Sequence, residues 1–215
     1  MTITIFTKYG IEVTIPPGKT RVSSSMSVTT RKEQTRQRII AATVEGIKEH
    51  GYGGIGVDGI AKKAGVTSGA FYGHFSSKNK VFEAAVSAGV MGLVEGVIYW
   101  RDTEGEQWLY PFIDWYLGND HRNNISGGCA LPGLSADVAR ADQAVHLAYE
   151  QQMVEAASII AASLNDPDEA QKQKTAWALL STLAGGVIVS RAMDNQVLAD
   201  EISLATGQAA KALVG

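Results

Sequence analysis

The segment GVTSGAFYGHFSSK, residues 65–78, gathers hydrogen-bonding side chains among glycines and aromatic rings. Its hydroxyl, phenol, imidazole and ammonium groups can all hydrogen-bond to phosphates or to base edges. The segment is too short and polar to be a core element, and it is too aromatic for an ordinary surface loop. Its glycines, Gly69 and Gly73, would let a partner approach the backbone closely. The composition therefore predicts a surface that meets a partner rich in hydrogen-bond acceptors.

A second chemically interesting segment is HRNNISGGCALPGLSADVARAD, residues 121–142, which contains Cys129. Helical character resumes at Leu131, and the amide dipoles of a helix N-terminus favour the thiolate form of a nearby cysteine. We hypothesise that modification of Cys129 changes the activity of the protein. The alternative is a small buried apolar cysteine, which is a common fate for a free thiol.

The charges are distributed unevenly along the chain. Residues 26–80 carry nine Lys and Arg against four Asp and Glu, whereas residues 81–215 carry seven against seventeen. The net charge of −3 thus hides a basic block that precedes an acidic remainder. Such a split points to a polyanionic partner for the first part of the chain only.

Composition sets the broad class. Hydrophobic residues make up 45% of the 215 residues, which is enough for a packed core, and no uninterrupted apolar run approaches a membrane span. A single cysteine fits a reducing compartment, so we expect a cytoplasmic protein. The start of the chain lacks the pattern of a secretory signal. Residues 1–28 are expected to form a poorly ordered extension, and the alternative is a short hairpin of Thr2–Phe6 against Ile11–Ile15.

From Thr30 onward the apolar spacing predicts helices. Thr30 and Glu33 form a possible capping box, and Gly51 is a plausible left-handed end of the first helix. A second short helix begins near Val57 and stops at Gly65. Thr67 or Ser68 then begins a third helix, and Ser76-Ser77 begins a fourth.

Residues 57–75 thus read as helix, tight turn, helix, which is the spacing of a helix-turn-helix. Gly65 supplies backbone freedom in the turn, and Val66 is expected to fill the space between the two helices. Phe71 and Phe75 lie one turn apart and are expected to pack inward. The outer side then carries Ser68, Gly69, Tyr72, Gly73 and His74.

The stretch TSGAFYGHFSSK resembles the recognition-helix signature of the TetR family of bacterial transcriptional regulators. The likeness continues upstream through GYGGIGVDGIAKKAGV and covers roughly residues 32–86. It implies an all-α fold in which a three-helix DNA-binding domain, residues 29–76, precedes a larger helical domain, residues 77–215, that binds an effector and dimerises. Family members commonly carry Thr or Ser ahead of the second helix, where this chain has Gly54-Ile55-Gly56. The expected DNA-binding residues are Thr67, Ser68, Gly69, Tyr72, Gly73, His74 and Lys78.

Aromatic residues gather in GEQWLYPFIDWYLGNDHR, residues 105–122, on two adjoining faces of a predicted helix. Ordinary core packing explains most of them. The resemblance nevertheless places an effector among helices of this kind, and some relatives respond to electrophiles through a cysteine. The expected effector-binding residues are Trp115, Tyr116, Cys129 and Tyr149.

The end of the chain is predicted to hold two further helices. In the first, Pro167 is expected at the first helical position, and the pair Gly185-Gly186 lies in the middle. Glycine costs about 1 kcal/mol against alanine inside a helix, so close helix–helix packing should compensate. The packing would be across the two-fold axis of a dimer, with a last helix near 195–213 completing the interface, or inside one subunit.

We therefore expect a ligand- or electrophile-responsive transcriptional regulator, a repressor that binds a palindromic operator as a homodimer. We expect no enzyme activity, cofactor or metal site: Cys129 with His121 or His146 would be the candidates for catalysis or metal binding, but no spaced ligand cluster appears. A third class is a protein that binds DNA without sequence preference or uses the helix-turn-helix for protein contact. The sequence identifies neither the effector nor the operator.

Overall fold

The computed structural model describes residues 3–6, 12–15 and 30–215. Its only described strands, β1 (Ile3–Phe6) and β2 (Glu12–Ile15), pair antiparallel with Ile3 opposite Ile15 and Phe6 opposite Glu12. Over these eight residues the structure has the hairpin that was the alternative to a poorly ordered extension. The rest of the predicted extension lies outside the described residues, so its order stays a prediction.

The helix-turn-helix is formed by short helices that follow a long first one. Helix α1 spans Arg31–Gly54, α2 spans Val57–Lys63 and α3 spans Ser68–Tyr72. The Thr30 hydroxyl accepts a hydrogen bond from the Glu33 amide at 3.3 Å, as expected for the cap of α1. Gly65 adopts a φ of 66° in the turn before α3, which confirms its predicted role.

Helix α1 changes direction near its end. Gly51 has a φ of 73° and a ψ of 166°, so the helix is kinked there and residues 52–54 form a separate last turn. This position was predicted as the end of the first helix. The kink removes the Tyr52 amide from the helical ladder, and that amide donates instead to Asp137 Oδ2 at 2.7 Å.

Helix α4 (Lys78–Glu104) begins at Ser77, whose hydroxyl accepts from the Lys80 amide at 3.2 Å. The helices that follow are η1 (Gly105–Gln107, a 3₁₀ turn), α5 (Leu109–Leu117), α6 (Asn119–Asn123), α7 (Leu131–Val138), α8 (Gln143–Ala162), α9 (Glu169–Arg191) and α10 (Gln196–Val214). The N-cap of α9 is Asp168, whose carboxylate accepts from the Ala170 amide. Pro167 therefore lies before the helix, and its predicted first helical position was wrong because the aspartate after it caps the helix.

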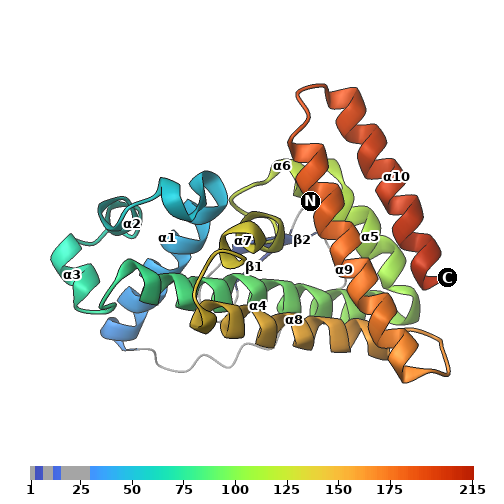
Figure 1. Cartoon of the computed structure of the whole chain (residues 1–215), viewed down its shortest axis with the longest axis horizontal. Helices are drawn as coiled ribbons and strands as arrows, with labels where there is room; N and C mark the ends of the chain where they lie inside the picture. The colour runs from blue at the N-terminus through green and yellow to red at the C-terminus, as the bar shows by residue number, and fades with distance from the viewer. Residues whose placement is uncertain (1–2, 7–11, 16–29) are drawn as a thin grey trace.

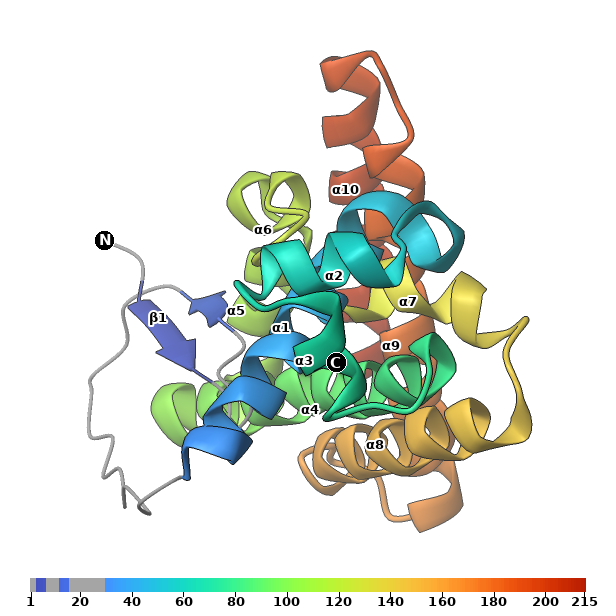
Figure 2. The same cartoon turned by 90° about the vertical axis from the view of Figure 1, so that its left-hand side faces the viewer.

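The helices form an elongated molecule with a small head and a larger body (Figure 1). Helices α1–α3 make the head at one end, α4 and α8 run side by side along the length, and α9 and α10 lie at the other end. Figure 2 views the molecule from the head, with α2 and α3 in front. The segment that was predicted to meet a partner therefore occupies one tip of the molecule.

Two hydrophobic clusters form the core, and α4 contributes to both. The first packs α1–α3 against the beginning of α4 and against α7, and the second packs the rest of α4 against α5, α8 and α9. Because the same helix continues from one cluster into the other, the head is coupled to the body through a shared element. The exact domain boundary stays a prediction.

Among the described residues, one segment, 78–107, is long and apolar enough to cross a membrane. The prediction from the sequence concerned uninterrupted apolar runs, whereas this segment also contains polar residues. Within its most apolar window, 61% is buried inside the protein. The segment is mainly α4, and its apolarity is that of a helix that packs on several sides at once.

Candidate nucleic-acid interface and effector cavity

Helix α3 separates its aromatic side chains between the interior and the surface. Phe71 and Phe75 are buried with their ring centroids 6.0 Å apart, as predicted. Tyr72 is 57% exposed and meets Phe71 edge to face at 5.3 Å. Packing of the two phenylalanines therefore fixes the orientation of the helix and turns the phenol of Tyr72 toward solvent.

The hydroxyls at the start of α3 are partly used within the protein. Thr67 is the N-cap, and its hydroxyl accepts from the Ala70 amide at 3.1 Å. Ser68 donates its hydroxyl proton to Asp58 Oδ1 at 2.6 Å. Its remaining capacity is as an acceptor, so Ser68 is suited to a base-edge amino group and not to a phosphate oxygen.

The other predicted contact residues differ in their exposure. Gly69 and Gly73 are exposed, whereas His74 is half-buried and its Nδ1 is covered without a hydrogen-bond partner. The Lys78 ammonium donates to the Tyr52 carbonyl and lies 4.1 Å from the centroid of the Tyr52 ring. Desolvation lowers the pKa of Lys78. Lys78 thus joins the start of α4 to the end of α1.

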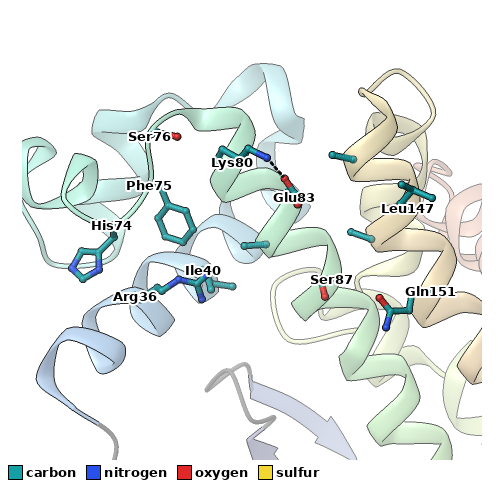
Figure 3. A pocket seen from close by; sticks show the side chains of 13 residues that line it. Arg36, Ile40, His74, Phe75, Ser76, Lys80, Glu83, Ser87, Leu147 and Gln151 are labelled. Carbon is teal, nitrogen blue, oxygen red and sulfur yellow. Dashed lines mark hydrogen bonds and ion pairs between the residues drawn. The ribbon is translucent and has the colours of Figure 1, made fainter.

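A groove of about 720 Å³ opens beneath α3, between the head and helix α8 (Figure 3). Arg36 of α1 lines it, and its guanidinium lies 5.1 Å from the centroid of the Phe75 ring. Lys80 pairs with Glu83 at 2.8 Å, and Leu147 and Gln151 line the opposite side from α8. Arg36 was not among the predicted site residues, although its position one turn before Ile40 places it beside the inner face of α1.

Comparisons with known proteins agree with this geometry. The sequence profile described as "Bacterial regulatory proteins, tetR family" matches residues 39–85. That range holds the two short helices, the turn and the start of α4. Residues 39–85 are a TetR-family helix-turn-helix domain.

Curated relatives are similar mainly over the TetR-family domain. The transcriptional regulator SrpR of Pseudomonas putida is 46% identical over 56 residues, which are 26% of this chain and 26% of SrpR. A regulator encoded in the lacX 3′ region of Lactococcus lactis is 25% identical over 135 residues, 61% of this chain and 68% of that protein. The match with SrpR thus spans only about a quarter of that relative.

The fold comparison extends beyond the TetR-family domain. The reduced form of Escherichia coli NemR superposes with a TM-score of 0.71 at 17% identity and covers 85% of this chain and 97% of that one. A likeness at this identity shows the fold alone. It confirms the predicted all-α architecture of a helix-turn-helix domain followed by a larger helical domain.

Three of the four predicted effector residues meet in the body of the molecule. Trp115, Tyr116 and Cys129 line a cavity of about 20 Å³ between α4, α5 and the start of α7. A cavity of this volume holds about one water molecule. Tyr149 does not line it: its hydroxyl lies 2.9 Å from Ser135 Oγ on α7.

Polar groups at this cavity are buried and few. Tyr116 is 1% exposed, and its hydroxyl makes no hydrogen bond within the described residues. The thiol of Cys129 lies near it, and burial raises the pKa of both groups. The Leu131 amide at the start of α7 donates to the Cys129 sulfur at 3.4 Å. Burial outweighs this favourable contact, so the thiol is not activated in the way that its position near a helix start predicted.

His121 lies beside Cys129 but is not paired with the thiol. Its Nδ1 is 2.6 Å from the Tyr116 carbonyl, and its Nε2 accepts from the Cys129 amide at 2.9 Å. Nδ1 therefore carries the proton and donates to the carbonyl. Burial lowers the pKa of His121 to about 4. Both nitrogens bind the main chain, so this imidazole is not placed to act as a base for the thiol.

The remaining wall of the cavity comes from Lys48 on α1, which the sequence analysis did not single out. Lys48 lies one turn after Val44, on the apolar face of the helix. This position in the apolar pattern could have indicated from the sequence that Lys48 is buried. It is 9% exposed, and burial lowers its pKa to about 8. Its ammonium donates to the carbonyls of Ser126 and Gly128, the latter at 2.6 Å.

Proposed function

We propose that this protein is a homodimeric, cytoplasmic transcriptional regulator that represses by binding a palindromic operator and releases it when an effector or electrophile occupies the body. The observation that carries the proposal is the TetR-family domain in which Phe71 of α3 and Phe75 just after it are buried while Tyr72 is exposed. Helix α3 would enter the major groove, as the second helix of a helix-turn-helix does.

The proposed contacts follow from the chemistry of each group. Tyr72 and His74 donate to phosphates, and the exposed Gly69 and Gly73 let the backbone approach the groove. Ser68 accepts from a base edge. The remaining members of the proposed interface are Thr67, which caps α3, and Lys78, which supports the start of α4. With so few long polar side chains on α3, sequence-dependent DNA shape contributes to recognition.

Dimerisation is proposed at the far end of the molecule. Exposed apolar side chains gather on α9, α10 and the turn between them: Ile188, Val189, Met193, Val197, Leu198, Leu204 and Leu213. Exposed apolar side chains on neighbouring helices support a protein–protein interface at this end. Two copies joined there by a two-fold axis would present two heads to the two halves of a palindrome.

The effector site is proposed at the cavity of Trp115, Tyr116 and Cys129, with Tyr149 behind its α7 wall. Modification of the Cys129 thiol, or binding of a small molecule beside it, would favour a state in which the two heads no longer fit one operator. Such a shift requires that the effector bind the two states unequally. We expect no catalytic activity, because His121 is committed to main-chain groups.

The first experiment selects bound fragments from a random DNA pool and measures affinity for the selected site. Tyr72→Ala should weaken binding about tenfold, the worth of one hydrogen bond to a charged group. The matched control is Tyr110→Ala, an exposed tyrosine of α5, which should bind like the wild type. Binding without sequence preference would instead support a non-specific binder, and no affinity at all would support a protein-contact module.

The effector hypothesis has its own test. The wild type and Cys129→Ser are compared for binding to the selected DNA with and without N-ethylmaleimide. Release from the wild type alone is expected, because Cys129 is the only cysteine of the chain. Equal release from both proteins would end the hypothesis that Cys129 is the responsive group.

A further inference from the structure

The head and the body are joined by polar contacts near the end of α1. Lys48 donates from α1 to the carbonyls of Ser126 and Gly128, which precede Cys129. We call this pair of hydrogen bonds the Lys48 latch. A second contact lies one turn further on, where the Tyr52 amide donates to Asp137 of α7. These hydrogen bonds therefore couple the position of α1 to that of the segment that leads into α7.

The Lys48 latch is unusual in its electrostatics. A buried ammonium is costly unless it is paired, and this one is bonded to carbonyl oxygens only. The nearest carboxylates, on Glu45 and Glu49, belong to the same helix and act on it only at a distance. The cation is held by carbonyls of the segment 126–128, and within the described residues no carboxylate forms an ion pair with it. Displacement of that segment therefore removes its hydrogen-bond acceptors.

The cavity is too small to accept a ligand without moving a wall. One wall is the backbone of α4, where Gly89, Gly92 and Gly96 line the cavity. Another is the cluster of Phe112, Trp115 and Tyr116, whose successive ring centroids lie 6.1 and 6.2 Å apart in tilted and edge-to-face arrangements. These walls are regular helix and close-packed rings, which yield only at a high cost in packing.

The third wall is the one that can move. It consists of the flexible Lys48 side chain and the turn at Gly128 and Cys129. The Lys48 side chain is joined to the turn by hydrogen bonds, and each contributes little net free energy compared with the packing of a core helix. A group larger than a water molecule that enters beside Cys129 will therefore separate Lys48 from the carbonyls.

We propose that the Lys48 latch is the switch through which occupation of the Cys129 cavity controls the DNA-binding head. With the cavity empty, the latch holds α1 against the segment 126–128 and the head is competent to bind DNA. Occupation of the cavity opens the latch and frees α1, together with α2 and α3, which pack on it. Lys48 is thus a positioning residue, and this inference rests on the proposed function.

The switch can be operated without knowing the natural effector. Methyl methanethiosulfonate transfers a methylthio group: the Cys129 thiolate attacks the sulfenyl sulfur, a disulfide forms, and methanesulfinate leaves with the bonding electron pair. Cys129→Met is the genetic counterpart, because its side chain has nearly the same length as the methylthio adduct. The substitution works even where the buried thiol reacts slowly.

The test is a double-mutant cycle on affinity for the selected DNA, using Cys129→Met, Lys48→Met and the combination. Cys129→Met should weaken binding roughly tenfold, within the usual range of allosteric coupling. In the Lys48→Met background the same substitution should change affinity less than twofold, because the latch is already open. Lys63→Met is the control for charge: it removes a lysine of the head that pairs with Glu45 and Glu49, and in its background Cys129→Met should keep its full effect.

Each result of the double-mutant cycle either supports or contradicts the proposal. Equal tenfold effects of Cys129→Met in the wild-type and Lys48→Met backgrounds would overturn the proposal, and so would the absence of any effect in the wild type. Circular dichroism and thermal unfolding confirm that each variant is folded. If Cys129→Met does not fold, methylthiolation of the folded wild type and of folded Lys48→Met gives the same comparison. Failure of the wild type to select any DNA would refute the proposed function instead, before the cycle begins.

Discussion

His121 illustrates how a single side chain can be fixed in one protonation state. A second proton on Nε2 would face the Cys129 amide, which already donates to that nitrogen. The folded pKa of about 4 lies below the ordinary value of 6.5, so the unfolded chain binds more protons between these values. The folded state therefore loses stability as the pH falls from about 6.5 to about 4.

This pH dependence can be measured by urea unfolding. Between pH 6.5 and 4 the wild type should lose on the order of 3 kcal/mol through His121 in addition to its other acid-sensitive groups. His121→Asn should be less stable at neutral pH, because the Cys129 amide loses its acceptor, and it should show a shallower slope. His146→Asn, at an exposed histidine of α8, should keep the wild-type slope. An identical slope in all three proteins would contradict the assignment.

Individual residues also show which contacts a sequence can reveal. Local rules correctly predicted the caps Thr30 and Ser77 and the inward packing of Phe71, because these depend on neighbours a few residues away. Lys48 was missed because its acceptors lie 78 and 80 residues further along the chain. The same holds for Arg122, which is buried and donates to Ala199 and Ser203 of α10.

At the scale of elements, the two adjacent glycines of α9 have different surroundings. A Cβ on Gly186 would lie 2.5 Å from Thr206 Cγ2 of α10, whereas a Cβ on Gly185 would meet nothing within 4 Å. Close packing inside one subunit therefore accounts for Gly186. Gly185 lies open within the chain, which leaves room for the partner subunit proposed at this end. Packing inside one subunit thus applies to Gly186, and the dimer explanation for Gly185 stays a prediction.

Alanine substitutions separate these two glycines. Gly186→Ala should lower the stability of the folded chain by about 1–3 kcal/mol at any protein concentration, because α10 must shift away. Gly185→Ala should leave the dissociated chain as stable or up to about 1 kcal/mol more stable, through its higher helix propensity. Thermal unfolding at low and high protein concentration checks both expectations. Equal destabilisation by the two substitutions in dilute solution would contradict the packing.

The types and bounds of several helices were predicted better than the pairing between helices. The helices near 57–64, 131–139 and 195–213 were placed within about two residues, since caps and apolar spacing are local signals. The pairing of α4 with α8 and the crossing of α7 over α1 could not be predicted, because apolar faces do not specify their partners. The cavity depends on that pairing, so its residues could be guessed one by one but not as a set.

At the scale of the whole molecule, binding of two heads to the two halves of a palindromic operator requires the proposed dimer. Val197 and Leu204 are 71% and 65% exposed and lie two turns apart on one face of α10. Val197→Glu with Leu204→Glu should convert a dimer into a monomer, because two charges would be buried at the interface. Sedimentation and DNA-binding measurements check this, and we expect the affinity for DNA to decrease when the dimer is lost.

A surface leucine elsewhere controls for the added charge. Leu147 is exposed on α8, away from the proposed dimer face, and Leu147→Glu should leave the protein dimeric. If the double variant on α10 still sediments as the wild type does, the interface lies on another surface. If the wild-type protein is itself a monomer, the proposed mode of operator recognition is wrong.

The division of charge between the two ends has a further consequence. The described part of the head carries more basic than acidic residues at one end of the molecule, while the acidic excess of residues 81–215 lies in the body. The molecule is therefore an electric dipole. In the field of a polyanion it will rotate before contact, so that most encounters begin with the correct end leading. The encounter rate should consequently decrease as added salt shortens the range of that field.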